Sequence, residues 1–180
     1  MGVMYDYFAA GSDERAATAL DLPAGPGGPL PARPQLMERI RAGDLAALQE
    51  LRTPRVRWGE HGFQVLEVKG VDPFVMLVTL EELLTGVAYD DIVEGPRAGT
   101  DIASADDGER MVVTVTDELQ QALARCSPDD LTRTAAAWAQ TEELGGDDDV
   151  QPLTVFLGVL ALLAREALGR GERLYCWVCV

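Results

Sequence analysis

The sequence predicts a single α+β domain over residues 1–180, with a small mixed sheet that includes both terminal strands and packs with about five to six helices. Strand-forming segments occur at both ends of the chain, and helical patterns with one short hairpin fill the region between them. With 180 residues, of which 47% are hydrophobic, the chain is able to bury a core without a metal or a disulfide. Both terminal segments are apolar on both faces, so each is expected at the centre of the sheet or covered on both sides.

The N-terminal region is expected to form a strand, a helix and a loop. Val3–Phe8 is dense in aromatic and β-favouring residues, which favour a strand. Ser12 is a good N-cap for the following helix, because its hydroxyl oxygen is able to accept a hydrogen bond from the first turn. Residues 22–34 are rich in proline and glycine, and this composition predicts a mobile surface loop inserted in the domain.

The next region is expected to contain two helices and a strand. Residues 35–52 have a helical pattern that breaks at Gly43, and Asp44 is placed to cap the second helix. Phe63–Val68 is a candidate strand, because it is rich in apolar and β-branched residues.

A helix and a hairpin are expected in the middle of the chain. The helix opens at Asp72-Pro73, where an N-cap residue precedes a proline at the first helical position, and it closes at Gly86. Asp107-Gly108 is a hairpin turn signal between two strand-like segments, Ile102–Ala105 and Met111–Val115.

The C-terminal region is expected to contain three helices and a strand. Thr116 and Ser127 are N-cap residues for the first two helices. Residues 152–168 predict the third, and its apolar stretch Leu153–Ala164 is shorter than a membrane span, which favours a buried core helix. Leu174–Val180 is the last strand.

The charge of the chain restricts its partners. Thirty acidic residues against 15 basic residues give a net charge of −15. A surface of this sign repels phosphate, so we expect neither nucleic acid nor a membrane as partner, whereas a basic protein partner fits. A homodimer is compatible with the same sequence. Arg52, Arg55 and Arg57, beside Trp58, form a locally basic patch whose expected role is to neutralise neighbouring acids.

The inventory of reactive residues argues against most catalytic sites. His61 is the only histidine, which excludes zinc sites that need two or more histidines. Cys176 and Cys179 form a C-x-x-C motif, but in a strand these positions point to opposite faces, so both thiols are expected to pack in the core. No G-x-S-x-G or phosphate-loop motif occurs. We therefore expect no catalytic residues, no cofactor and no metal, and, since no export signal is apparent, a cytoplasmic protein with free thiols.

Three parts of the chain carry a resemblance to a known family. The first is the start of the chain, where Met1-Gly2 leads into a strand with Tyr5 and Tyr7. The second is the end of the central helix, Leu80-Glu81-Glu82-Leu83-Leu84-Thr85-Gly86. The third is the end of the chain, where an apolar helix with Ala164-Arg165-Glu166-Ala167 is followed by Gly169-Arg170-Gly171 and a final strand. In this order of elements the chain resembles the YfbM-like family of uncharacterised small bacterial proteins. The resemblance implies an α+β fold and no established activity. Where that family tends to carry Trp and His in its central helix, this chain has Leu77 and Glu81.

Two functions of different classes follow from these observations. The first is a non-catalytic, immunity- or inhibitor-like module that uses its negative charge to bind a basic protein. The alternative is a small-ligand-binding protein or an enzyme with a pocket of aromatic and carboxylate side chains. The candidate residues for such a pocket or interaction site are Tyr5, Tyr7, Trp58, His61, Asp72 and Trp138.

Overall fold

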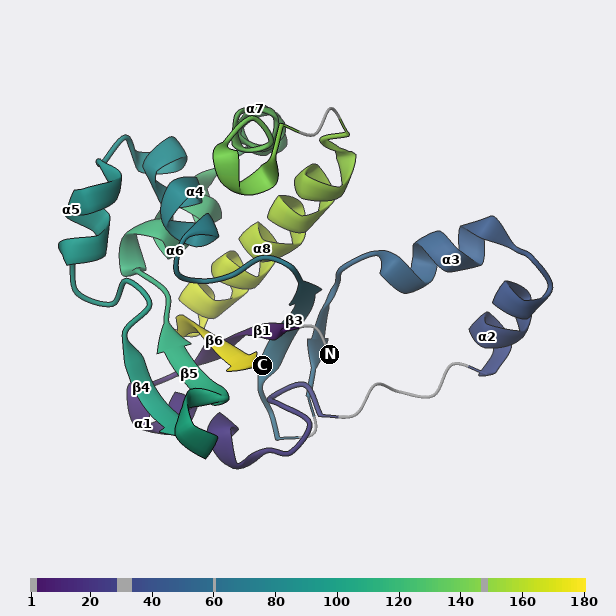
Figure 1. The fold of residues 1–180 in the computed structure, drawn as a ribbon, viewed down its shortest axis with the longest axis horizontal. Coiled ribbons are helices and arrows are strands. Elements are labelled where there is room, and N and C mark those ends of the chain that lie inside the picture. Colours follow the sequence, from purple (N-terminus) through teal and green to yellow (C-terminus); the bar gives the residue numbers. More distant parts are fainter. Residues whose placement is uncertain (1–2, 29–33, 60, 147–148) are drawn as a thin grey trace.

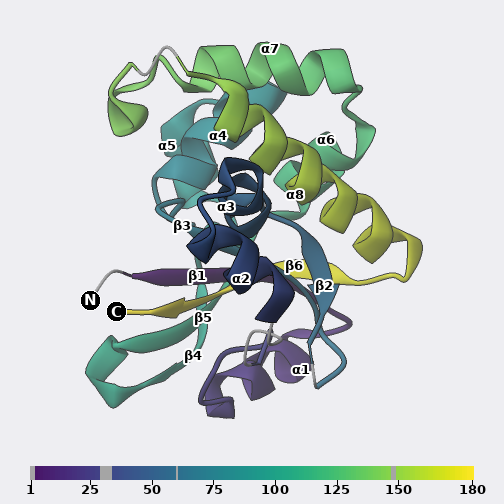
Figure 2. The same ribbon diagram turned by 90° about the vertical axis from the view of Figure 1, so that its right-hand side faces the viewer.

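A six-stranded sheet forms the centre of the molecule, as shown by a computed structural model that describes residues 3–28, 34–59, 61–146 and 149–180. The strand order is β2-β3-β1-β6-β5-β4 (Figures 1 and 2). The strands are β1 (Met4–Ala10), β2 (Val56–Trp58), β3 (Gln64–Lys69), β4 (Asp101–Ala105), β5 (Arg110–Thr114) and β6 (Arg173–Cys179). The two terminal strands are neighbours at the centre of the sheet, as their apolar composition predicts.

The sheet differs in one respect from the mixed sheet that we expected. Its five strand pairings are all antiparallel. The helices between β5 and β6 return the chain to the end of the sheet that it left, since Val115 donates its backbone N–H to the carbonyl oxygen of Leu174 at 3.1 Å. Neighbouring strands therefore run in opposite directions, and no parallel crossover forms within the described residues.

Helices cover the two faces of the sheet unequally (Figures 1 and 2). The larger layer contains α4 (Met76–Thr85), α6 (Asp117–Arg125), α7 (Pro128–Trp138) and α8 (Gln151–Gly169), with α5 (Tyr89–Glu94) packed against α4. The opposite face is covered by α1 (Asp13–Ala17) and the 3-10 turn η1 (Thr18–Asp21). Two more 3-10 turns are η2 (Asp106–Gly108) and η3 (Glu142–Leu144). The described part of the chain thus has eight α-helices, two of which form the separate hairpin described below.

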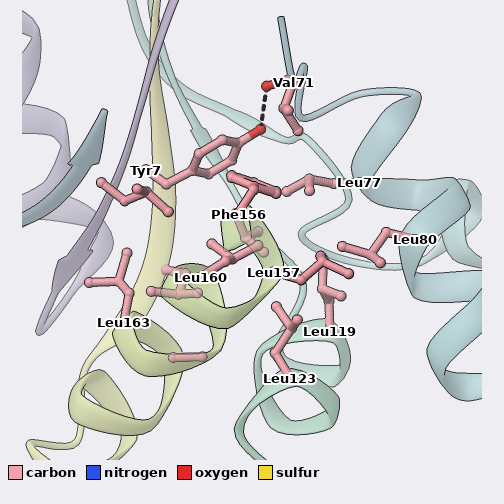
Figure 3. Packing of buried hydrophobic residues seen from close by; sticks show 14 of the residues in the cluster. Tyr7, Val71, Leu77, Leu80, Leu119, Leu123, Phe156, Leu157, Leu160 and Leu163 are labelled. Atoms are coloured by element: carbon pink, nitrogen blue, oxygen red, sulfur yellow. Dashed lines mark hydrogen bonds between the residues drawn. The ribbon is translucent and has the colours of Figure 1, made fainter. Parts of the chain in front are cut away.

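The larger core lies between the sheet and α8. Figure 3 shows Phe156, Leu157, Leu160 and Leu163 of α8 together with Tyr7 of the central strand. The Tyr7 hydroxyl donates a hydrogen bond of 2.7 Å to the carbonyl oxygen of Val71, so this buried polar group is satisfied. α8 is long and apolar enough to cross a membrane by length and composition alone, a test that the core helix of a soluble protein also passes. Here its buried residues contact the sheet.

The alternation of β6 confirms the opposite orientations expected for the C-x-x-C motif, but Cys179 is only partly buried, against the expectation that both thiols pack in the core. Cys176 is fully buried in the core under α8, whereas Cys179 packs at the edge of the core on the opposite face with Trp177. Both thiols are free, as is that of Cys126. The extended backbone therefore keeps the two sulfur atoms on opposite sides of the sheet.

Most helix ends follow from local sequence. Ser12, Asp44 and Thr116 accept backbone N–H groups of the turns that follow them, and Ser127 forms a capping box with Asp130. Gly86 ends α4 with φ of 74°, a left-handed conformation that favours glycine.

One local prediction differs from the structure, and two short elements were not predicted. Asp72 caps a turn through the N–H groups of Phe74 and Val75, and α4 begins only at Met76. The sequence analysis missed α5, which has no side-chain N-cap, and the three-residue strand β2.

The Pro/Gly-rich segment is less exposed than we expected. Gly25, Pro26, Gly27 and Gly28 are buried, and a Cβ on Gly25 would lie 2.7 Å from a carboxylate oxygen of Asp6 and 3.0 Å from the Trp177 ring. Glycine at this position is what allows the chain to approach the sheet so closely. Residues 29–33 lie outside the described residues.

A two-helix hairpin stands away from the rest of the molecule (Figures 1 and 2). It consists of α2 (Pro34–Arg41) and α3 (Leu45–Arg52), and we call residues 34–53 the arm. The predicted break at Gly43 is confirmed, since this glycine has φ of 85° in the turn between the helices. Asp44 caps α3 and also pairs with Arg39 at 2.8 Å.

Burial of Cys176 predicts unequal thiol reactivity. A water-soluble thiol reagent should modify native Cys179 and Cys126, which are partly exposed, but not Cys176 until the protein unfolds. Cys176→Ala should therefore leave the number of thiols labelled in the native protein unchanged, whereas Cys179→Ala should lower it by about one. Equal loss of native labelling in both variants would contradict the predicted placement of the two thiols.

Candidate functional site

The structure places Tyr5, Tyr7, Asp72 and Trp138 in or beside the larger core. Tyr7 and Trp138 are fully buried, and Trp138 packs against Phe156 with ring centroids 6.2 Å apart. Partial burial raises the pKa of Tyr5, and the negative charge of Asp72 adds to the rise. Tyr7 and Trp138 thus pack in the core, where their role is to support the fold.

Trp58 and His61 lie elsewhere, near the β2 edge of the sheet. Trp58 is 61% exposed, and the guanidinium of Arg170 lies 5.3 Å from its ring centroid. His61 is exposed, and its backbone carbonyl accepts a hydrogen bond of 2.6 Å from Arg15. The six candidate residues are therefore not brought together in one pocket, and none of them lines either of the two cavities described below.

An open groove of about 440 Å³ lies between three helices of the larger layer. Its walls come from the end of α4, one face of α6 and the start of α7. The lining residues are Leu84, Thr85, Glu118, Gln121, Ala122, Arg125, Cys126 and Asp130. The volume is within the range of ligand and side-chain binding sites.

Two carboxylates give the groove its chemical character. Glu118 lies in the first turn of α6, and Asp130 lies in the first turn of α7. Hydrogen bonds from the side chain and backbone of Ser127 lower the pKa of Asp130, so it is ionised at neutral pH. Arg125 donates to the side-chain oxygen of Gln121 at 3.1 Å. Asp130 also pairs with Arg133, so the groove offers the carboxylate of Glu118, for which no ion pair is described, beside the apolar surface of Leu84 and Ala122.

A second cavity is too small for a ligand. It measures about 10 Å³ and lies between α4 and β5, where Glu81 and Thr116 contribute to its wall. Glu81 is buried, and its carboxylate accepts a hydrogen bond from the Thr116 hydroxyl. Burial raises the pKa of Glu81. This pair ties α4 to the start of α6 and so fixes one wall of the open groove.

A second buried carboxylate lies on the other face of the sheet, beneath the Pro/Gly-rich segment. Asp6 faces Glu67 across the β1–β3 pairing, and Arg57 of β2 donates a hydrogen bond to Glu67. The same guanidinium donates to the carbonyl oxygens of Gly27 and Gly28. Arg57, which follows the arm in the chain, therefore links Gly27 and Gly28, which precede the arm, to Glu67 of β3. We call Asp6, Arg57 and Glu67 the clasp.

Burial dominates the electrostatics of the clasp. Burial, followed by the negative charge of Glu67, raises the pKa of Asp6 to about 7, although Arg57 and the Gly27 N–H oppose the rise. The expectation that Arg57 neutralises neighbouring acids agrees with its contact to Glu67. Asp6 was missed, because an acid between two tyrosines in a strand gives no local sign that a distant loop covers it.

Another ion-pair network joins α1 to the sheet. Arg97, which has φ of 72°, donates to Asp13 at 2.8 Å, and the Tyr175 hydroxyl donates to the same carboxylate oxygen at 2.8 Å. Burial, followed by the hydrogen bond to Asp13, raises the pKa of Tyr175 to about 12. The network joins three separated segments and borders neither cavity, which is typical of a structural role. No group of three or more metal-binding side chains occurs within the described residues.

The raised pKa of Asp6 predicts a specific pH dependence of stability. Because the folded-state pKa lies above the unfolded value, the contribution of Asp6 is complete below about pH 4 and is lost as the pH rises through about 7. Relative to Asp6→Asn, the wild type should lose up to about 4 kcal/mol of unfolding free energy over this range, at 1.36 kcal/mol per pKa unit. Urea unfolding at several pH values measures this difference. The exposed Asp21→Asn is the control, and parallel pH profiles of wild type and Asp6→Asn would show that Asp6 is not the titrating group.

Comparison of the chain with protein-family models, with curated proteins and with solved structures finds no match. The function is therefore inferred from the geometry and charge of the sites above.

Proposed function

We propose that this protein is a non-catalytic, acidic interaction module that binds a basic segment of another protein in the groove between α4, α6 and α7. The observation that carries the proposal is the groove itself, an open cavity of about 440 Å³ with Glu118 and Asp130 in its wall. An arginine or lysine side chain fits this combination, because its stem packs on apolar atoms while its charged end meets a carboxylate.

The surroundings of the groove favour a protein as the partner. Leu83 at the end of α4, Val87 in the following connection and Val93 on α5 are exposed apolar residues. α5 also presents Asp90, Asp91 and Glu94, which are exposed. Apolar contacts surrounded by charged groups are the usual composition of a protein interface, and the net charge of −15 would accelerate the approach of a basic partner.

The side chains of the groove suit recognition better than catalysis. Cys126 borders the groove, but partial burial and then the negative charge of Asp130 raise the pKa of its thiol. A protonated thiol is a poor nucleophile. Asp130 already accepts hydrogen bonds from Ser127 in the capping box and from Arg133, so its position is fixed before a partner arrives and its charge is partly balanced. We propose that the protein acts in the cytoplasm, where its three thiols would stay reduced.

The proposal is tested with a short oligo-arginine peptide as the probe, titrated into the isotope-labelled full chain by NMR and calorimetry. Glu118→Gln with Asp130→Asn should weaken binding at least about tenfold, because the lost charge-assisted hydrogen bond of Glu118 alone is worth about 1.5–3 kcal/mol. Asn retains an acceptor for Ser127, so the cap of α7 should survive. The largest shifts should fall on the amides of α6 and the start of α7.

The matched control is Glu142→Gln with Glu143→Gln in η3, which removes the same charge from exposed positions at the other end of α7. This double variant should bind the peptide within about threefold of wild type. Equal weakening by both double variants would mean that the peptide senses only the net charge, and the groove would then not be a site.

A further inference from the structure

The arm is the least supported part of the described fold. Its two helices have eight residues each, and helices of this length are marginal in water unless they pack against other structure. Leu36 and Ala47 are buried. The polar contacts described for the arm, Arg39 with Asp44 and Asp44 with the first turn of α3, lie within it. Figure 1 shows that the arm projects to one side of the body, and Figure 2 shows it from that side.

The arm exposes apolar surface that its own two helices do not cover. Leu45 is 75% exposed and Met37 is 40% exposed, the former being the most exposed of the large apolar side chains described. Twenty residues cannot bury a sufficient core by themselves, since domains below about 40 residues need a partner or a crosslink. An additional packing surface would supply the missing contacts.

The distribution of charge along the chain indicates which molecule supplies that packing surface. Residues 34–53 contain three arginines, Arg39, Arg41 and Arg52, and three acids, Glu38, Asp44 and Glu50. The rest of the chain holds 12 basic and 27 acidic residues, so the entire net charge of −15 lies outside the arm. Two copies of this protein repel each other through their bodies and meet without net repulsion only where they are neutral.

We infer that two copies of this chain associate arm to arm, forming a small four-helix bundle around a two-fold axis. The two-fold axis makes the interface self-complementary, and it buries Leu45 and Met37 of both copies together. With the axis between Arg39 and Ile40, the antiparallel α2 helices bring Glu38 of one copy beside Arg41 of the other. The bodies then lie on opposite sides of the bundle, where their repulsion is weakest.

This inference concerns a surface separate from the α4–α6–α7 groove and does not depend on the proposed function. Sedimentation equilibrium of the full chain over a range of protein concentrations should show a monomer–dimer equilibrium. Added salt should tighten the dimer, because it screens the repulsion between the bodies. A chain that sediments as a monomer at every concentration and salt level overturns the inference.

Leu45→Arg locates the interface. Since Leu45 is exposed in the single chain, the variant should fold as wild type does, but the dimer should weaken at least about 100-fold because a two-fold interface contains the substitution twice. The matched control is Leu168→Arg, an exposed leucine near the end of α8 with the same change of charge, and its dimer should match wild type. A dimer that survives Leu45→Arg, or that is lost equally in the control, overturns the inference.

A charge exchange tests the two-fold pairing. Glu38→Arg and Arg41→Glu should each weaken the dimer, because each places like charges opposite one another. The double variant restores opposite charges across the axis at an unchanged net charge, so it should recover at least about tenfold of the lost affinity. Failure of the double variant to recover overturns the proposed arrangement of the two arms.

Discussion

The antiparallel pairing of β1 with β6 is the contact on which the rest of the molecule depends. It joins the two ends of the described chain over seven residue pairs, from Met4 with Cys179 to Ala10 with Arg173. Apart from Asp6 and Arg173, both strands are mainly apolar on both faces, so the pair can be stable only between two layers. The α8 layer covers one face and α1 with the Pro/Gly-rich segment covers the other. All other strands extend this central pair outward.

The arrangement of the larger layer on this pair creates the groove. α8 lies on the sheet, α6 packs against α8, and α4 packs against α6, so each helix is placed by the one beneath it. The buried Glu81–Thr116 hydrogen bond then ties the middle of α4 to the start of α6. Glu118 and Asp130 follow the N-caps Thr116 and Ser127 by two and three residues, so both lie in the first turn of their helices. The groove is thus positioned by helix caps and core packing.

Features encoded by neighbouring residues could be predicted from the sequence, and features formed by distant segments could not. The caps at Ser12, Asp44, Thr116 and Ser127, the central position of the terminal strands and the opposite orientations of Cys176 and Cys179 each follow from a short stretch. The groove joins α4, α6 and α7, and the clasp joins β1, β2, β3 and the Pro/Gly-rich segment, so neither has a local pattern. Aromatic residues were misleading as site candidates, because Tyr7 and Trp138 are large apolar groups that the core needs.

The two edge strands of the sheet make aggregation by strand pairing between molecules unfavourable in concentrated solution. One edge, β2, is only three residues long, and the other, β4, has a register shift between Asp101 and Ala103. Short or irregular edge strands have few unpaired backbone N–H and C=O groups in a row, so a strand from another molecule can form few hydrogen bonds with them. The fold is accordingly protected against growth into fibrils by strand addition, even though its central strands are among the most apolar segments of the chain.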